Sequence, residues 1–574
     1  MPRIAQDLRY PAMGSPPVPL PTEHEANLQH SAGSSKVYLL FALGSGLIVT
    51  ALSLALFGAS GRDDPYITFS AAEAIVHNGR LANINGDAIE QSTTLLLTLL
   101  LAGLYWLTGI STPLLGWIVS FAALAAITPT AYLILRRSLS DSRALIGAVI
   151  ASMTPPLVYW AASGAEQSLA ILLTLVLVIL MDRLADERGS WWLISAAAVI
   201  SAMVFLTRPD LGLSAFAATG VLAVLALVTR RYSLSQRLGA LAGSQVVLIL
   251  AISLARVSTT GSALPQPLGA KVGTNLIEQI SRGVSYVITN ALSPWFVVVV
   301  IVAAVILWRA RPRSVPVGIS FLFLNAVAIL AGTTLSGGDW MELGRFFAAP
   351  ATFLVIAVMS LTQQLSVRAF GAVSTILLVS PIATMILWST APTAVEARGS
   401  NIFNRWVLET TGSPGVPETL SNPFNRWNAD HLGDSYFLGA AVPEVAKVLA
   451  TDPAKQFTIT SGQGGLIPYV LRREFGDQIR FIDRFQLMTD DFADCDLPAG
   501  TYGSFISWNQ WQNFAGQCAP ELPDMVFSIG PIPLDDLRDD YAVIVHVEGS
   551  AVQETGSLPQ EQWLAVKREY VTHP

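Results

Sequence analysis

Charged residues are scarce in this chain. Asp, Glu, Lys and Arg together make up 13% of its 574 residues, while 52% are hydrophobic and the mean hydropathy is +0.51. Soluble domains carry about 25% charged residues, so an ordinary soluble protein is excluded. The net charge of -7 and the pI near 5.5 offer no basic surface for nucleic acid. The composition predicts a polytopic α-helical membrane protein that binds membrane lipids and no nucleic acid.

A cleavable signal peptide is also missing. Such a peptide has a basic segment followed by a short apolar run, whereas residues 1–35 are polar and rich in Pro, Ser and His. We expect residues 1–35 to form a disordered cytoplasmic tail.

Cysteine is nearly absent. The chain has two, Cys495 and Cys518, and both lie in its final third. An oxidising compartment permits them to pair. Sequence separation does not give the distance between the thiols, so a disulfide and two free cysteines both remain open.

Long apolar runs dominate the first two thirds of the chain. Eleven of them are compatible with membrane helices: residues 37–57, 114–135, 144–160, 169–181, 192–206, 211–228, 238–254, 291–308, 316–335, 346–361 and 370–388.

The arginines set the predicted orientation. Counting the apolar segment 93–107 as a span would put Arg136 and Arg137 outside, against the positive-inside rule, so we expect it at the outer interface or re-entering. The connections at residues 136–143, 182–188, 230–237, 309–313 and 367–368 then all face the cytoplasm. An odd number of spans places the N-terminus inside and residues 391–574 outside the membrane, with residues 36–390 as the transmembrane domain.

The last third changes character. Residues 391–574 hold no spanning run, but β-like stretches at 456–460 and 541–547 alternate with Pro and Gly. They predict a mixed α/β domain outside the membrane. Its tryptophans have two interpretations: Trp508 and Trp511 either offer aromatic faces to a ligand such as a sugar ring or belong to the core.

The first outer loop, residues 58–112, begins with two adjacent carboxylates, Asp63 and Asp64. Charges at a membrane boundary are costly unless they face water, a partner or a substrate. One carboxylate suits a general base; the pair could also be a solvated helix end. Like-charge repulsion raises one pKa and a nearby arginine acts oppositely, so the sequence does not decide which Asp stays ionised.

Other ionisable residues return to the same face. Arginine and lysine bind phosphate well, so this face suits transfer of a group from a lipid phosphate. Membrane anchoring by the basic residues, helix capping by Glu166, a purely structural His77 and a simple Gly-rich connector before Asp339 are the alternatives. The candidates are Arg62, His77, Glu166, Arg208, Lys271, Asp339 and Arg345.

Several outer-loop motifs resemble, in the same order, those of GT-C fold glycosyltransferases. They are the Asp pair with YITF at 66–69, NINGDAIEQSTTLLL at 83–97, SGAE at 163–166, LTRPD at 206–210, the 261–271 segment and GGDWMELGRF at 337–346. The nearest branch holds the mycobacterial terminal arabinofuranosyltransferase of cell-wall arabinan and related mannosyltransferase-like proteins. Two departures, Gln266 where Asn is common and Ala165 where a larger residue is usual, leave the sugar undecided.

The resemblance implies an inverting transferase. It would move arabinofuranose or another sugar from a polyprenyl-phosphate donor to an envelope glycan, lipid or protein on the outer face. The catalytic role falls on Asp63 or Asp64, and phosphate contacts fall on Arg208, Lys271 and Arg345. The sequence requires no cofactor, because it has no His or Cys cluster, although a divalent cation (Mg, Mn or Ca) is compatible with the family. A lipid or polysaccharide transporter or flippase and an inactive envelope-assembly scaffold are the alternatives.

Overall fold

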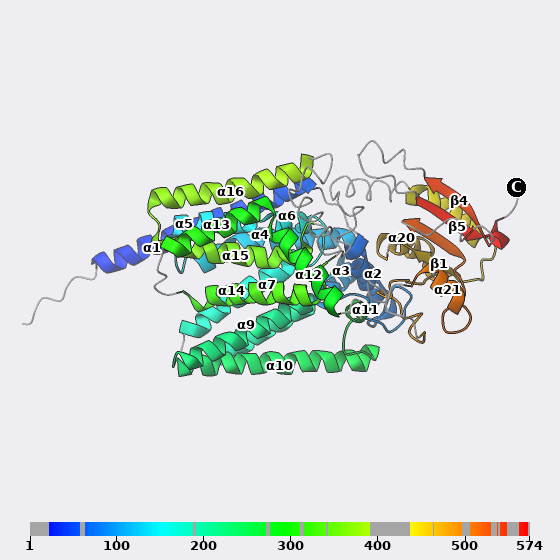
Figure 1. Ribbon diagram of the computed structural model, residues 1–574, viewed down its shortest axis with the longest axis horizontal. Helices are drawn as coiled ribbons and strands as arrows, with labels where there is room; N and C mark the ends of the chain where they lie inside the picture. Colours follow the sequence, from blue (N-terminus) through cyan, green and yellow to red (C-terminus); the bar gives the residue numbers. More distant parts are fainter. Residues whose placement is uncertain are drawn as a thin grey trace, which may run out of the picture.

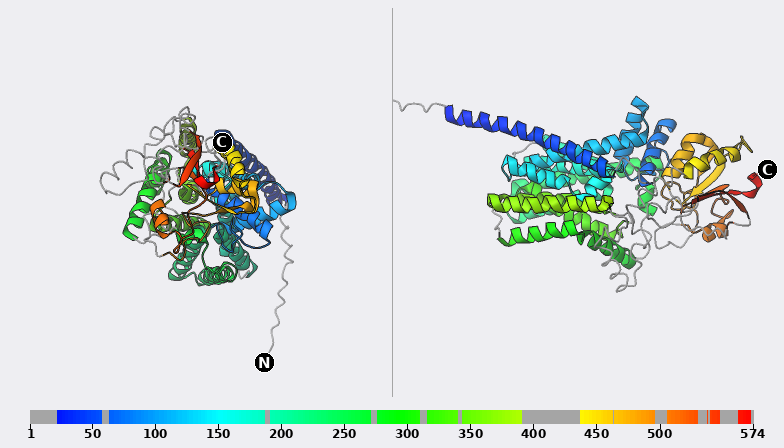
Figure 2. Two further views of the ribbon diagram at one scale, coloured as in Figure 1. Left: turned by 90° about the vertical axis from the view of Figure 1, so that its right-hand side faces the viewer. Right: turned by 90° about the horizontal axis from the view of Figure 1, so that it is seen from above.

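A computed structural model describes residues 22–57, 63–186, 191–270, 276–309, 315–339, 343–390, 437–462, 464–495, 506–529, 537, 540–547 and 562–571. The molecule is elongated. A bundle of roughly parallel helices occupies one end, and a small domain built on a β-sheet occupies the other (Figures 1 and 2).

Eight helices in the described residues are long and apolar enough to cross a membrane. The protein is therefore a multi-pass membrane protein. The spans belong to α1 (Thr22–Phe57), α4 (Thr112–Leu135), α7 (Gln167–Asp186), α9 (Pro209–Val228), α10 (Tyr232–Thr260), α14 (Val317–Leu335), α15 (Ala348–Leu361, with η1 Arg345–Phe347 before it and η2 Thr362–Gln364 after it) and α16 (Val367–Thr390).

The other three predicted spans are not simple straight helices. Two are broken: α5 (Asp141–Ser152) meets α6 (Pro155–Ala161) at 62°, and α12 (Leu276–Ala291) meets α13 (Pro294–Arg309) at 79°. Both second helices begin at proline, which lacks the backbone N–H that a continuous helix needs. The third, α8 (Trp191–Thr207), has only 17 residues.

The apolar segment that we left out of the spans forms α3 (Leu95–Thr108). Fourteen residues of helix rise about 21 Å, less than the ~30 Å hydrocarbon core. The helix packs on α2 (Asp63–Asn78) at the end of the bundle that faces the sheet (Figure 1).

The predicted tail is partly wrong. Helix α1 begins at Thr22 and projects from the bundle at the end opposite the sheet, and residues 1–21 lie outside the described residues (Figure 2). Glu, Ala, Leu and Gln between positions 22 and 35 favour a helix. Because the apolar span already supplies a nucleus, extending the helix costs little.

The C-terminal domain is mixed α/β, as predicted. Five strands follow the order β2-β1-β3-β5-β4. Strand β1 (Phe457–Ser461) pairs in parallel with β2 (Ile479–Phe481) and β3 (Met525–Ile529), whereas β5 (Gln562–Lys567) pairs antiparallel with β3 and β4 (Tyr541–Val547). The short elements are α20 (Leu466–Phe475), α21 (Trp508–Phe514), η4 (Gly476–Gln478) and η6 (Arg568–Tyr570). Cys495 and Cys518 form a disulfide with Cα atoms 5.1 Å apart.

One hydrophobic core joins the sheet to the first outer loop. Phe69 and Leu97 from the loop and Phe457 and Ile467 from the domain belong to the same buried cluster. Helix α20, which connects β1 to β2, lies against α2 (Figure 1). The C-terminal domain is therefore packed onto the loop that carries the Asp pair.

Candidate functional site

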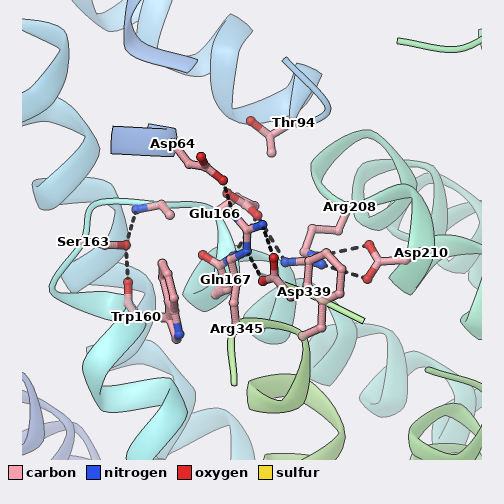
Figure 3. Close-up of polar contacts among 12 residues, drawn as sticks. Asp64, Thr94, Trp160, Ser163, Glu166, Gln167, Arg208, Asp210, Asp339 and Arg345 are labelled. Carbon is pink, nitrogen blue, oxygen red and sulfur yellow. Dashed lines mark hydrogen bonds and ion pairs between the residues drawn. The ribbon is translucent and has the colours of Figure 1, made fainter. Parts of the chain in front are cut away.

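Asp63 and Asp64 are the first two residues of α2, and both are partly exposed. Their side chains have different partners. The Asp64 carboxylate accepts a 2.6 Å hydrogen bond from Arg345 Nη1, on the side of the helix bundle (Figure 3). The Asp63 carboxylate instead accepts hydrogen bonds from the C-terminal domain.

Arg345 is the centre of the site. It lies in η1, directly after Gly344, whose positive φ of 70° turns the chain before α15. Its Nε and Nη2 donate to the two oxygens of Asp339 at 2.7 and 2.9 Å, a bidentate pair. The rings of Trp160 and Phe346 lie 5.7 and 5.2 Å from the guanidinium. The Arg345 side chain is 9% exposed, so it is held on nearly all sides.

Arg208 stands beside this pair. It follows the end of α8, and Pro209 begins α9. Its guanidinium donates to both oxygens of Asp210 at 3.1 and 2.8 Å and to Glu166 at 3.2 Å. It also stacks on Phe346 at 4.6 Å from the ring centre. Both guanidinium groups therefore lie close to the same aromatic ring.

Glu166 reaches the site from the SGAE turn between α6 and α7. Gly164 has a φ of 75°, and a Cβ there would come within 2.6 Å of Trp117, so this turn needs glycine. The cluster thus combines the first outer loop with three later connections that are far apart in the sequence (Figure 3).

Carboxylates outnumber the arginines in this cluster. Arg208 and Arg345 face four acids: Asp64, Glu166, Asp210 and Asp339. Mutual pairing holds the guanidinium groups in place without a ligand. Within the described residues, no group of three or more His, Cys, Asp or Glu side chains is placed to hold a metal ion.

The Asp63 carboxyl has an unusual pKa. Its pKa is raised from 3.8 to about 7. Burial is the main cause and the charge of Asp64 adds to it, whereas hydrogen bonds from the backbone N–H groups of Leu466 and Gly465 lower the pKa. A carboxyl that titrates near neutral pH is suited to accept a proton from a substrate.

The other predicted candidates have varied positions. His77 is exposed at the far end of α2, where its Nδ1 pairs with the Glu73 carbonyl, about 21 Å along the helix from Asp63, so it lies away from the cluster. Arg62 and Lys271 lie outside the described residues.

The tryptophan expectation needs a correction. The side chains of Trp508 and Trp511 are buried, and they pack on each other and on Phe492 and Tyr541 in a core of the C-terminal domain. Their faces are covered, so they stabilise this domain and do not offer a platform for a sugar. The SWNQWQN segment is amphipathic enough for either interpretation, and only the packing decides.

Sequence reasoning missed two parts of the site. The aromatic rings of Trp160 and Phe346 shape the arginine cluster, although nothing in their local sequence marks them. The backbone amides of Gly465 and Leu466 contact Asp63 from about 400 positions away. An amide donor has no sequence signature, so only the fold could find it.

Comparisons with known proteins agree with this architecture. The family described as dolichyl-phosphate-mannose-protein mannosyltransferase matches residues 106–255, about a quarter of the chain. Two structures of ArnT from Cupriavidus metallidurans, bound to undecaprenyl phosphate and in the apo state, are similar with TM-scores of 0.54 and 0.55. Each is 12% identical and covers 94% of this chain and 99% or 100% of its own. The chain has a GT-C fold.

No curated protein matches the sequence. The GT-C likeness that the outer-loop motifs indicated is thus confirmed at the level of the fold. Neither comparison points to the arabinofuranosyltransferase branch.

Proposed function

We propose that this protein is an inverting membrane glycosyltransferase that moves a sugar from a polyprenyl-phosphate donor to a hydroxyl group on the outer face of the membrane. One observation carries the proposal: two adjacent carboxylates divide between an arginine cluster on one side and a partly exposed, proton-accepting position on the other. The fold supports it, since a structure with the same fold was obtained with undecaprenyl phosphate bound.

Asp63 is the proposed general base. Its pKa near 7 leaves a large share ionised at neutral pH, with enough basicity to take a proton. Asp63 Oδ1 accepts hydrogen bonds from Leu466 N–H at 2.7 Å and from Gly465 N–H at 3.0 Å. Oδ2 accepts only from Gly465 N–H, at 3.1 Å. Oδ2 therefore has a lone pair available for the acceptor hydroxyl.

The reaction is a single displacement. As the acceptor hydroxyl gives its proton to Asp63, its oxygen bonds to the anomeric carbon, and the bond from that carbon to the phosphate oxygen breaks. The polyprenyl phosphate leaves with the electron pair and gains one negative charge. Attack opposite the leaving group inverts the anomeric centre.

Arg345 and Arg208 are the proposed phosphate contacts. Positioned guanidinium groups stabilise the charge that develops on a leaving phosphate. Asp64 and Asp339 hold Arg345 ready, so Asp64 acts through Arg345 and not as the base. Because carboxylates outnumber arginines in the described cluster, we expect Lys271, a residue of the 261–271 outer segment, to add positive charge when donor binds.

The donor sugar and the acceptor are proposed at a coarser level. Arabinofuranose or another pentose or hexose is the expected donor sugar, and an envelope glycan, lipid or protein is the expected acceptor. The protein is proposed to work in a bacterial inner membrane with its C-terminal domain in the periplasm. No described feature demands a divalent cation, and adding or chelating one during the assay tests this directly.

Donor turnover in liposomes tests the proposal. The purified protein is incubated with a panel of polyprenyl-phosphate sugars, and polyprenyl phosphate release is measured for wild type, Asp63→Asn and Asp64→Asn. We expect Asp63→Asn to lower kcat by about 100-fold or more, whereas Asp64→Asn should mainly raise the donor KM.

Two results would contradict the proposal. If wild type consumes no donor, or both Asn variants match wild type, the chain is not this transferase. Movement of a labelled lipid-linked sugar across the same liposomes without turnover would favour the flippase, and neither movement nor turnover would favour the scaffold.

A further inference from the structure

The first outer loop and the C-terminal domain meet through specific polar contacts. Asn85 exchanges two hydrogen bonds with the backbone of Phe481, at 2.7 and 2.9 Å, and Asn83 donates to the Met488 carbonyl at 3.0 Å. Side chains of the loop thus recognise main-chain groups of the domain. Such contacts fix the register between the two parts more tightly than an apolar interface would.

Helix α2 and helix α20 are aligned at several points. The rings of Tyr66 and Tyr469 lie 5.3 Å apart, and the Tyr469 hydroxyl donates to Glu73 at 2.9 Å. At the start of both helices, the Asp63 carboxylate accepts hydrogen bonds from the backbone N–H of Leu466 at 2.7 Å and of Gly465 at 3.0 Å. These are the N1 and N-cap residues of α20, whose first N–H groups have no partner within the helix.

Glycine at 465 is required by this approach. A Cβ there would lie 1.9 Å from the Asp63 backbone oxygen and 2.8 Å from Oδ1. The backbone conformation of Gly465, with a φ of -106°, suits any residue, so space alone demands glycine. The neighbouring Gly464 differs, because its nearest contact would be the Met488 sulfur at 3.6 Å, an ordinary distance.

We propose that the N-terminus of α20 is part of the active site, where the Gly465 and Leu466 amides orient the Asp63 carboxylate toward the acceptor. The C-terminal domain then completes the catalytic loop, and the two residues are positioning residues. The acceptor hydroxyl approaches from the domain side of the Asp pair, while the donor phosphate binds on the bundle side, where Asp64 and Arg345 lie. This inference rests on the proposed function.

A matched pair of glycine variants tests it. Gly465→Ala should displace the amides from Asp63, and a misplacement of about 1 Å is enough to lower kcat by about 100-fold. The donor KM should stay within about twofold, because the arginine cluster is untouched. Gly464→Ala is the control and should keep the wild-type kcat, since its added methyl group has room.

A second pair of variants tests the loss of the Leu466 N–H. Leu466→Pro and Leu466→Ala both lose the leucine side chain, but only proline loses the donor to Oδ1. Proline is tolerated at the first position of a helix, which is where residue 466 lies. We expect Leu466→Pro to turn over at least about tenfold more slowly than Leu466→Ala, which corresponds to one lost charge-assisted hydrogen bond.

The pH profile separates orientation from general damage. Both amides lower the pKa of Asp63, so their loss should move the acid limb of kcat/KM to higher pH. The charged or titratable groups facing Asp63 are Asp64, Asp483 and Tyr66, and all three remain in these variants.

Two results would overturn the inference and leave the proposed transferase standing. One is a folded Gly465→Ala variant with the wild-type kcat, and the other is a Leu466→Pro variant that turns over donor as fast as Leu466→Ala. Absence of turnover in wild type itself would instead remove the proposed function. Donor binding at wild-type affinity establishes that each variant is folded.

Discussion

At the scale of single residues, adjacency in the sequence does not mean shared chemistry. Asp63 and Asp64 are neighbours at the start of α2, yet one contacts backbone amides and the other a guanidinium. Successive helical positions point about 100° apart, so two neighbouring side chains can serve opposite sides of a helix end. This division fits the proposed roles, in which Asp63 is the base and Asp64 positions a cation.

The pKa of Asp63 makes a prediction about pH. Only the ionised carboxylate accepts a proton, so log(kcat/KM) should rise with pH and level off above an apparent pKa of about 7. Below pH 7 the rate should fall about tenfold per unit. Initial rates of donor consumption between pH 5 and 9 give this profile. A flat profile, or a limb near the ordinary value for aspartate, would show that Asp63 is not the base.

At the scale of elements, a buried ion pair joins the first outer loop to α10. Arg256 Nε and Nη2 donate to the Glu90 carboxylate at 2.7 and 2.9 Å, and both side chains are 3% exposed. The backbone carbonyl of Glu90 also accepts a hydrogen bond from the N–H of Gln266, the first residue of α11 (Gln266–Ala270). This pair ties the loop that precedes Lys271 to the loop that carries Asp63.

Breaking this pair should be costly. Glu90→Gln leaves the Arg256 charge buried without its counter-ion, and we expect it to lower stability by about 3–5 kcal/mol. Thermal unfolding of the purified protein in detergent measures the change. The double variant Glu90→Leu with Arg256→Met should recover part of it, because an apolar pair leaves no buried charge. A single variant as stable as wild type would show that water reaches the pair.

At the scale of the whole molecule, the disulfide is consistent with the predicted extracytoplasmic position of the C-terminal domain. Cys495 and Cys518 are the only cysteines in the chain, and they are bonded. Disulfides persist outside the cytoplasm and are rare inside it. The bond should stabilise the domain by about 3 kcal/mol for a loop of this length.

Alkylation in intact cells tests the predicted orientation. A maleimide polymer should shift the mass of the denatured chain only after reduction, because both thiols are oxidised when the domain lies outside. A Cys495→Ser/Cys518→Ser variant should never shift and should unfold at a lower temperature than unreduced wild type. Labelling of wild type without prior reduction would place the domain in the cytoplasm or leave the bond unformed.

The sequence alone determined the class of the molecule and most of the charged residues of its candidate site. Many apolar runs of spanning length with few charges are typical of a chain that folds in a bilayer, so the helical spans could be predicted. The absence of such runs after residue 390 predicted the separate C-terminal domain. Asp64, Glu166, Arg208, Asp339 and Arg345 were found because charge at helix ends is conspicuous against an apolar background, and the structure brings them together.

Only the tertiary structure decided which partners these residues contact. The partners of Asp63 and Asp64, the breaks in two spans, the burial of Trp508 and Trp511 and the disulfide all depend on contacts between distant segments. The amides of Gly465 and Leu466 illustrate the reason. Every residue except proline has a backbone N–H, so its use as a ligand of Asp63 is a property of position in space and not of residue type.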